Sequence, residues 1–214
     1  MGREPRGIKA DESFSYSKLE RLASGFRKHL GLEPTTRLAG LELYDNLPDT
    51  VVNGVPYKVE CSVDHLNGVE AEASFNAERG RYQLLLTPET YDLLESGNPH
   101  GTWVMVHEYA HVALHGRLLQ RLAKMELARK AALYKGTPVP HPFYLDTEWQ
   151  TDSFTAAALM PAAGIAHLEE NPIKVFGQAL SLVRCVTTTF GTSQEAAQYR
   201  IDTFKRRRYE LLSA

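Results

Sequence analysis

The feature that most constrains this chain is a pair of histidines four residues apart, in the segment His107-Glu108-Tyr109-Ala110-His111. On an α-helix, residues at this spacing lie about 40° apart around the axis and roughly 6 Å apart along it, so both imidazoles can reach one ion. Neutral imidazole nitrogens are typical ligands of Zn²⁺, and Mn²⁺ could also bind. Glu108 can flank such an ion without binding it, and can accept a proton from water whose pKa the metal lowers towards about 7. The segment therefore predicts a helix that carries two metal ligands and a general base.

A catalytic zinc site needs a third protein ligand, and Glu148 is the candidate. It stands near the start of a second predicted helix, which could pack across the first and offer its carboxylate to the metal. Asp152 lies four residues later on the same helix face and could hold the free N–H of His107 or His111, which would fix the tautomer of that ligand. The alternative for both acids is a purely structural one, since the helix dipole favours negative charge near a helix N-terminus.

The second helix contains a longer block of sequence, Glu148-x-Gln150-x-Asp152-x-Phe154-x-Ala156-Ala157-x-Leu159-Met160-Pro161. Together with the histidine motif, this block resembles the ImmA/IrrE family of metallopeptidases. The resemblance implies a zincin-like fold and an intracellular endopeptidase that cleaves helix-turn-helix transcriptional repressors in mobile-element, phage or stress-response regulation. It also implies that His107, His111 and Glu148 are metal ligands and that Glu108 is the catalytic base. The later block often carries a second glutamate, which is Gln150 here, and the spacing from Asp152 assigns the ligand role to Glu148.

The remaining pattern predicts an α+β fold, because strands come first and helices follow. A helix is expected from Tyr16 to Leu30, ended by Gly31. Three short strands, over residues 55–61, 69–75 and 82–86, are expected to form an antiparallel meander packed on helices. Further helices are expected over residues 88–96, 102–116, 117–134 and 147–160, with Thr87 and a Thr147–Gln150 capping box at two of the starts and a Pro-rich loop at 136–142.

These expectations divide the chain into a flexible N-terminus (1–14), a zincin-like metallopeptidase domain (15–164) and a helical, helix-turn-helix-like C-terminal region (165–214). In the last of these, Gly191 separates two predicted helices, and Thr192 and Glu195 form a predicted capping box on the second. A recognition helix for DNA should be basic, yet residues 194–199 carry no positive charge. This argues against direct DNA binding and favours a helical support that docks a protein substrate.

Other polar residues near the motif have less specific interpretations. His115 continues the four-residue spacing, but it lies about 12 Å along the helix from His107, too far to share an ion, so a polar contact at the helix end is expected. Tyr109 is expected to face away from the metal and pack. His141 and Tyr144 could stabilise an oxyanion, although surface positions in a loop are the favoured interpretation.

Composition limits the class of protein and the cellular location that can be expected. The chain has 214 residues and a formal net charge of −2, and this near-neutral charge argues against a dedicated nucleic-acid binder. Its two cysteines are too few for a disulfide framework, which favours the reducing cytoplasm. No apolar stretch is long enough to suggest a membrane span. Two alternatives stay open: a non-proteolytic regulatory module with a structural zinc that binds a repressor or DNA, and a partner protein of a toxin–antitoxin or phage locus.

Overall fold

The computed structural model describes residues 6–125 and 141–214. The chain forms two compact units, the first made of Met1–Phe14 and Gly40–Asp152 and the second of Ser15–Ala39 and Ser153–Ala214. This division differs from the domain boundaries expected at residues 14 and 164, because the first helix of the chain groups with the C-terminal helices. The helix that carries Glu148 contributes its first residues to the first unit and its remainder to the second.

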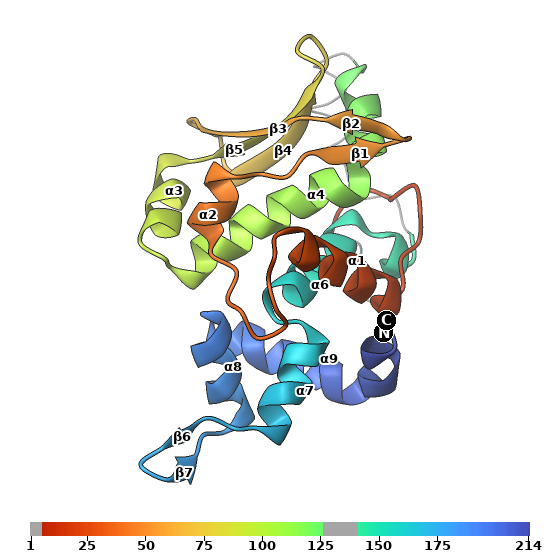
Figure 1. Ribbon diagram of the computed structural model, residues 1–214. Helices are drawn as coiled ribbons and strands as arrows, with labels where there is room; N and C mark the ends of the chain where they lie inside the picture. Colours follow the sequence, from red (N-terminus) through yellow and green to blue (C-terminus); the bar gives the residue numbers. More distant parts are fainter. Residues whose placement is uncertain (1–5, 126–140) are drawn as a thin grey trace. The chain divides into compact units, whose positions relative to one another are not determined.

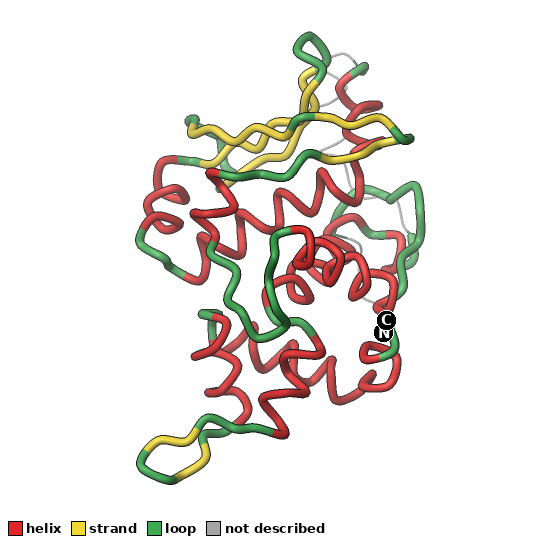
Figure 2. The backbone as a smooth tube through the Cα atoms, viewed as in Figure 1, coloured by secondary structure: helices red, strands yellow, loops and turns green. Residues whose placement is uncertain are grey.

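The first unit contains all strands of the described residues except one short hairpin (Figure 2). Its elements in chain order are α2 (Gly40–Asp45), β1 (Thr50–Val52), β2 (Val55–Tyr57), β3 (Val59–Val63), β4 (Ala71–Asn76), β5 (Arg81–Leu86), α3 (Pro88–Glu95), α4 (Pro99–Ala123), the 3-10 helix η1 (Phe143–Leu145) and the start of α6 (Thr147–Leu159) (Figure 1). Helix α3 follows the prediction closely: the Thr87 side chain accepts the N–H of Thr90, and Gly97 beyond the helix has φ +70°.

The sheet is mixed, so the predicted antiparallel meander is wrong. Strand β5 lies in the centre, antiparallel to β4 and parallel to β3. The predicted strand 55–61 is broken at Lys58, and its first part pairs with β1 in a separate hairpin around Asn53 and Gly54. The connection between β3 and β4 is long enough to skip one strand position, about 10 Å, which leaves the central place for β5.

Helix α4, which carries the histidine motif, lies along one face of this sheet (Figure 1). Strand β5 buries alternate residues, Tyr82, Leu84 and Leu86, in the core of the unit. Gly116 allows a close approach, because a Cβ there would lie 2.7 Å from Val52 Cγ2 and 2.8 Å from Tyr82 Oη. The histidine motif is thus carried by a helix whose position is fixed by tight packing.

Helix α4 is longer than predicted at both ends. It begins at Pro99, three residues before the expected start, and the side chain of Asn98 accepts the N–H of His100. Gly116 does not end the helix; the backbone bends at His115 (φ −121°, ψ 19°) and continues to Ala123. The apolar side chains that follow Gly116 are buried, which favours continuation over termination. The rest of the helix predicted over 117–134, and most of the Pro-rich loop, lie outside the described residues.

Residues 6–14, part of the N-terminal segment predicted to be flexible, make specific contacts with the rest of the first unit. The backbone N–H groups of Arg6 and Gly7 donate to Asp146 Oδ2 at 2.8 and 3.0 Å, and the side chains of Ala10 and Phe14 are buried. This segment is held by backbone pairing with residues that precede α6, a long-range interaction that a polar composition does not reveal. Residues 1–5 of the predicted segment lie outside the described residues.

The second unit is built mainly of helices. Its elements are α1 (Tyr16–His29), the end of α6, α7 (Ala162–Glu170), β6 (Lys174–Val175), β7 (Gln178–Ala179), α8 (Leu182–Phe190) and α9 (Gln194–Leu212). Helix α1 is confirmed, with Gly31 at φ +70° beyond its end, and Gly191 separates α8 from α9 at φ +64°. The capping box at Thr192 is wrong by one residue, because the Ser193 side chain accepts the N–H of Ala196. The β6–β7 hairpin was not predicted.

A buried ion pair lies in the core of the second unit. Glu20 of α1 and Arg200 of α9 are each 3% exposed, and Arg200 Nη2 donates to Glu20 Oε2 at 2.5 Å. The other carboxylate oxygen accepts the N–H of Ala162 at 2.7 Å, and Arg200 Nε donates to the carbonyl of Met160 at 2.9 Å. Both charges are therefore compensated, as burial requires. Among the described residues, no helix has the length and apolar character needed to cross a membrane.

Candidate metal centre

Three side chains predicted as metal ligands converge in the first unit. His107 Nε2 and His111 Nε2 lie 3.2 Å apart, consistent with one turn of α4 presenting both rings on the same side. Glu148, in the first turn of α6, places Oε2 3.3 Å from His107 Nε2 and Oε1 3.4 Å from His111 Nε2. Within the described part of the chain, these residues form a group that could hold a metal ion.

The spacing of these atoms fits a tetrahedral ion. Ligand atoms at about 2.0–2.1 Å from a tetrahedral metal stand about 3.3 Å from one another. The two imidazole nitrogens stand 3.2 Å apart, and each lies 3.3–3.4 Å from a different oxygen of Glu148, Oε2 for His107 and Oε1 for His111. Two imidazoles and one carboxylate form a ligand set that suits zinc and leaves a fourth position for a water molecule or substrate. The residues present therefore fit a divalent metal.

The electrostatics of the cluster favour a positive charge at its centre. Burial alone would lower the pKa of His107, but contacts with Asp152 and Glu148 outweigh it and raise that pKa to about 10. Burial would raise the pKa of Glu148, yet its bonds to His107 and His111 hold that pKa far below the ordinary range. The carboxylates around His107 thus favour a positive charge at this point, which a divalent ion would supply.

Residues next to Glu148 on α6 contact the outward nitrogens of both imidazoles. Asp152 Oδ1 lies 3.2 Å from His107 Nδ1, and Thr151 Oγ1 lies 3.4 Å from His111 Nδ1. Of the two histidines considered for Asp152, the structure therefore places it against His107. Thr151 was missed, although its position three residues after Glu148 puts it on the same helix face. Such outer contacts orient the rings of metal-binding histidines.

The start of α6 is fixed by Asp146 and not by the predicted Thr147–Gln150 capping box. Asp146 Oδ1 accepts the N–H of Trp149 at 2.9 Å, which is the contact of an N-cap residue. The Gln150 amide, fully buried, instead donates to the carbonyls of Glu12 and Tyr144, both at 2.8 Å. Gln150 is therefore occupied elsewhere and does not join the ligand group.

Glu108 lies on α4 immediately after the first histidine and is half-buried. Burial raises its pKa above that of an ordinary glutamate, although the two neighbouring histidines oppose the shift. Burial also raises the pKa of the Cys61 thiol on β3 to about 12, with a smaller contribution from the charge of Glu108. Glu108 thus combines the position expected of a base with a pKa moved towards neutrality.

The remaining polar residues lie outside the ligand group. His115 is buried at the bend inside α4 and not at a helix end, and burial lowers its pKa to about 3, so its ring is neutral. Tyr109 is buried, in agreement with a packing role. His141 Nε2 lies 3.4 Å from Asp146 Oδ2, while Tyr144 is exposed, and a contribution of either to an oxyanion site stays a prediction.

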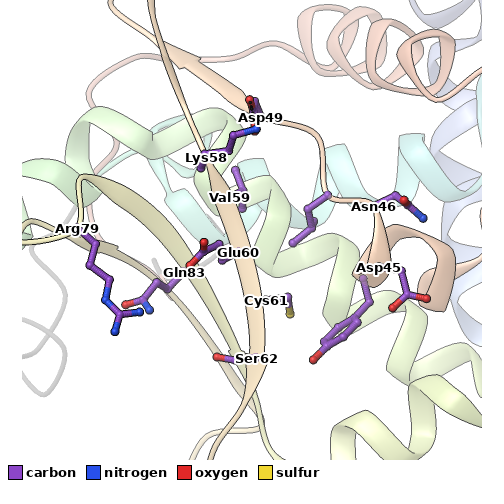
Figure 3. Close-up of a pocket in the computed structure, with 12 residues that line it drawn as sticks. Asp45, Asn46, Asp49, Lys58, Val59, Glu60, Cys61, Ser62, Arg79 and Gln83 are labelled. Atoms are coloured by element: carbon purple, nitrogen blue, oxygen red, sulfur yellow. Dashed lines mark ion pairs between the residues drawn. The ribbon is translucent and has the colours of Figure 1, made fainter.

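A pocket of about 470 Å³ lies elsewhere in the first unit (Figure 3). Its lining is largely polar and comes from α2, the loop after it, strands β3 and β5 and the residues just before these two strands, and it includes Cys61, Glu60 and Lys58. The ligand residues His107, His111 and Glu148 are not among its lining residues. The pocket and the metal group are thus separate features.

Comparison with models of known protein families finds no match for this chain, and comparison with curated proteins finds none that is significantly similar.

Proposed function

We propose that this chain is a zinc-dependent endopeptidase that cleaves a helix-turn-helix transcriptional repressor, as members of the ImmA/IrrE family do. The observation that carries the proposal is the convergence of His107, His111 and Glu148, each of which offers one ligand atom within 4.8 Å of the others. Glu108 follows the first of these residues on the same helix, a position from which it can accept a proton from water beside the ion.

The residues have distinct parts in the proposed reaction. His107, His111 and Glu148 would hold the ion, which acts as a Lewis acid that polarises a carbonyl and lowers the pKa of water. Glu108 accepts the proton of the attacking water and later delivers it to the leaving amine, a transfer for which its raised pKa is suited. Asp152 and Thr151 keep the rings of His107 and His111 in their binding orientation.

The resemblance to the ImmA/IrrE family also guides our proposals for the fold, the metal, the location and the regulatory system. We assign a zincin-like arrangement to the mixed sheet and α4, and zinc in preference to Mn²⁺ because the ligand set contains two imidazoles. A cytoplasmic location is supported by Cys61 and Cys185, which are both free thiols. The repressor would belong to a mobile-element, phage or stress-response system.

The test uses the purified chain, zinc and a helix-turn-helix repressor encoded by a neighbouring gene. Glu108→Gln should lower the cleavage rate by about 10²- to 10⁴-fold, the usual contribution of a general base. Zinc content should be unchanged, since Glu108 is outside the ligand group. Glu95→Gln, at an exposed position at the end of α3, is the matched control and should cleave normally. Unchanged cleavage by Glu108→Gln would refute the proposed mechanism.

A regulatory binding module with a structural zinc is the competing proposal, because α8 and α9 form a helix–turn–helix around Gly191. One observation weakens its DNA-binding form. Arg200, a basic residue of α9, is buried in an ion pair with Glu20, so its charge is not available to phosphates. A salt-dependent complex with DNA, without proteolysis, would favour this alternative or a partner protein of a toxin–antitoxin or phage locus.

A further inference from the structure

The segment of residues 6–12, here called the arm, joins the two helices that carry the candidate metal ligands. At α6, the backbone N–H of Thr147 donates to the carbonyl of Ile8 at 3.1 Å. At α4, Arg121 donates from both terminal nitrogens to Asp11, at 2.6 and 2.8 Å. The arm therefore ties the helix of His107 and His111 to the helix of Glu148.

One side chain of the arm reaches the candidate centre itself. Arg6 Nη2 donates to Asp152 Oδ2 at 2.5 Å, and the other oxygen of Asp152 lies 3.2 Å from His107 Nδ1. The guanidinium, the carboxylate and the imidazole thus form a continuous chain that ends on a metal ligand. The Arg6 side chain is 61% exposed, so this ion pair should add little to the stability of the fold. Its effect should instead appear in how Asp152 orients His107.

The next residue of the arm lies directly against the third ligand. A Cβ on Gly7 would lie 2.7 Å from Glu148 Cγ and 2.9 Å from Glu148 N, and would also meet Thr147 Oγ1. Contacts this short do not occur in folded proteins, so any side chain at position 7 would displace the arm or Glu148. Gly7 is needed here because the arm approaches the ligand helix closely.

We propose that the arm is part of the metal centre: Arg6 is a positioning residue that acts through Asp152 on His107, and Gly7 lets the arm hold Glu148 in place. The inference rests on the proposed function only in requiring that His107, His111 and Glu148 bind a metal. It does not depend on the reaction that the centre performs.

The test measures the dissociation constant of Zn²⁺ for the full chain, by competition with a chromogenic chelator. Asp152→Asn should weaken zinc binding by about 10- to 100-fold, the usual effect of losing an outer contact to a ligand. Arg6→Ala should weaken it by about two- to fivefold, the equivalent of an exposed ion pair, and Arg6→Lys should restore most of that loss. In the Asp152→Asn background, Arg6→Ala should have no further effect, because both act along one path.

Two matched controls separate positioning from general damage. Arg81→Ala removes another arginine of the first unit that pairs with a carboxylate, Glu60, away from the ligand group, and should leave zinc affinity unchanged. Gly7→Ala should weaken zinc binding by about tenfold or more through displacement of Glu148. Gly25→Ala is its control, because a Cβ at Gly25 meets nothing within 4 Å. Far-UV circular dichroism would show that each variant is folded.

The outcomes distinguish this inference from the proposed function. Wild-type zinc affinity in Arg6→Ala and Gly7→Ala, or full additivity of Arg6→Ala with Asp152→Asn, would overturn the role of the arm while leaving the peptidase proposal intact. Zinc binding that depends on the arm, without any proteolysis, would support the inference and count against the peptidase. A wild-type chain that binds no zinc would overturn both.

Discussion

The buried pair between Glu20 and Arg200 allows a quantitative prediction about the second unit. Glu20→Gln keeps the size of the side chain but removes the negative charge that compensates Arg200, which is 3% exposed. Removing one partner of a buried ion pair destabilises proteins by about 3–5 kcal/mol, because the other charge stays buried without compensation. Typical proteins have a free energy of unfolding of only about 5–15 kcal/mol, so the effect should be large.

Urea denaturation followed by circular dichroism would measure this change. Glu169→Gln, which removes the exposed partner of Arg208, is the control and should leave the free energy of unfolding nearly unchanged. Replacing both partners, as in Glu20→Leu with Arg200→Met, should recover most of the loss, since no charge then stays buried. A loss below about 1 kcal/mol for Glu20→Gln would refute the reasoning, because it would mean that Arg200 finds water or another anion without cost.

Two further predictions concern the first unit. Zinc at about 100 times its dissociation constant should raise the free energy of unfolding by about 2.7 kcal/mol. Glu148→Ala should abolish both this increase and the zinc content of the purified chain. If zinc still stabilised this variant, groups other than Glu148 would be binding the ion. Gly116→Ala should lower the free energy of unfolding, measured by urea denaturation, by about 1–3 kcal/mol, because the new Cβ would lie 2.7 Å from Val52 Cγ2. An unchanged value would show that α4 can move away from the sheet without cost.

Features encoded by neighbouring residues could be predicted from the sequence. Helix α3 begins and ends where Thr87 and Gly97 indicate, and Gly31 follows the end of α1. These signals work because a cap or a left-handed glycine satisfies backbone groups of its own helix, whatever the rest of the chain does. The errors at Thr147 and Thr192 have the same origin: two capping residues stood side by side, and the contact of the neighbour decided the outcome.

Features that depend on distant pairing could not be predicted in this way. The strand sequences indicate where β3, β4 and β5 lie, but not that β5 takes the central place, since alternation of side chains specifies the faces of a strand and not its neighbours. Likewise, the polar composition of residues 6–14 says nothing about the backbone bonds that hold them beside α6. In both cases the deciding hydrogen bonds join residues far apart in the sequence.

The candidate metal centre combines both kinds of information, which explains how much of it the sequence could predict. On α6, residue 150 points about 200° away from residue 148, while residues 151 and 152 return to the face of residue 148. Helix geometry alone therefore puts Glu148 and Gln150 on opposite faces, before any tertiary contact is known. The same geometry puts Thr151 on the face of Glu148, where it contacts His111. No such periodicity connects Arg6 to Asp152, 146 residues later. Residues that orient a metal ligand from another segment of the chain therefore have to be found in the structure.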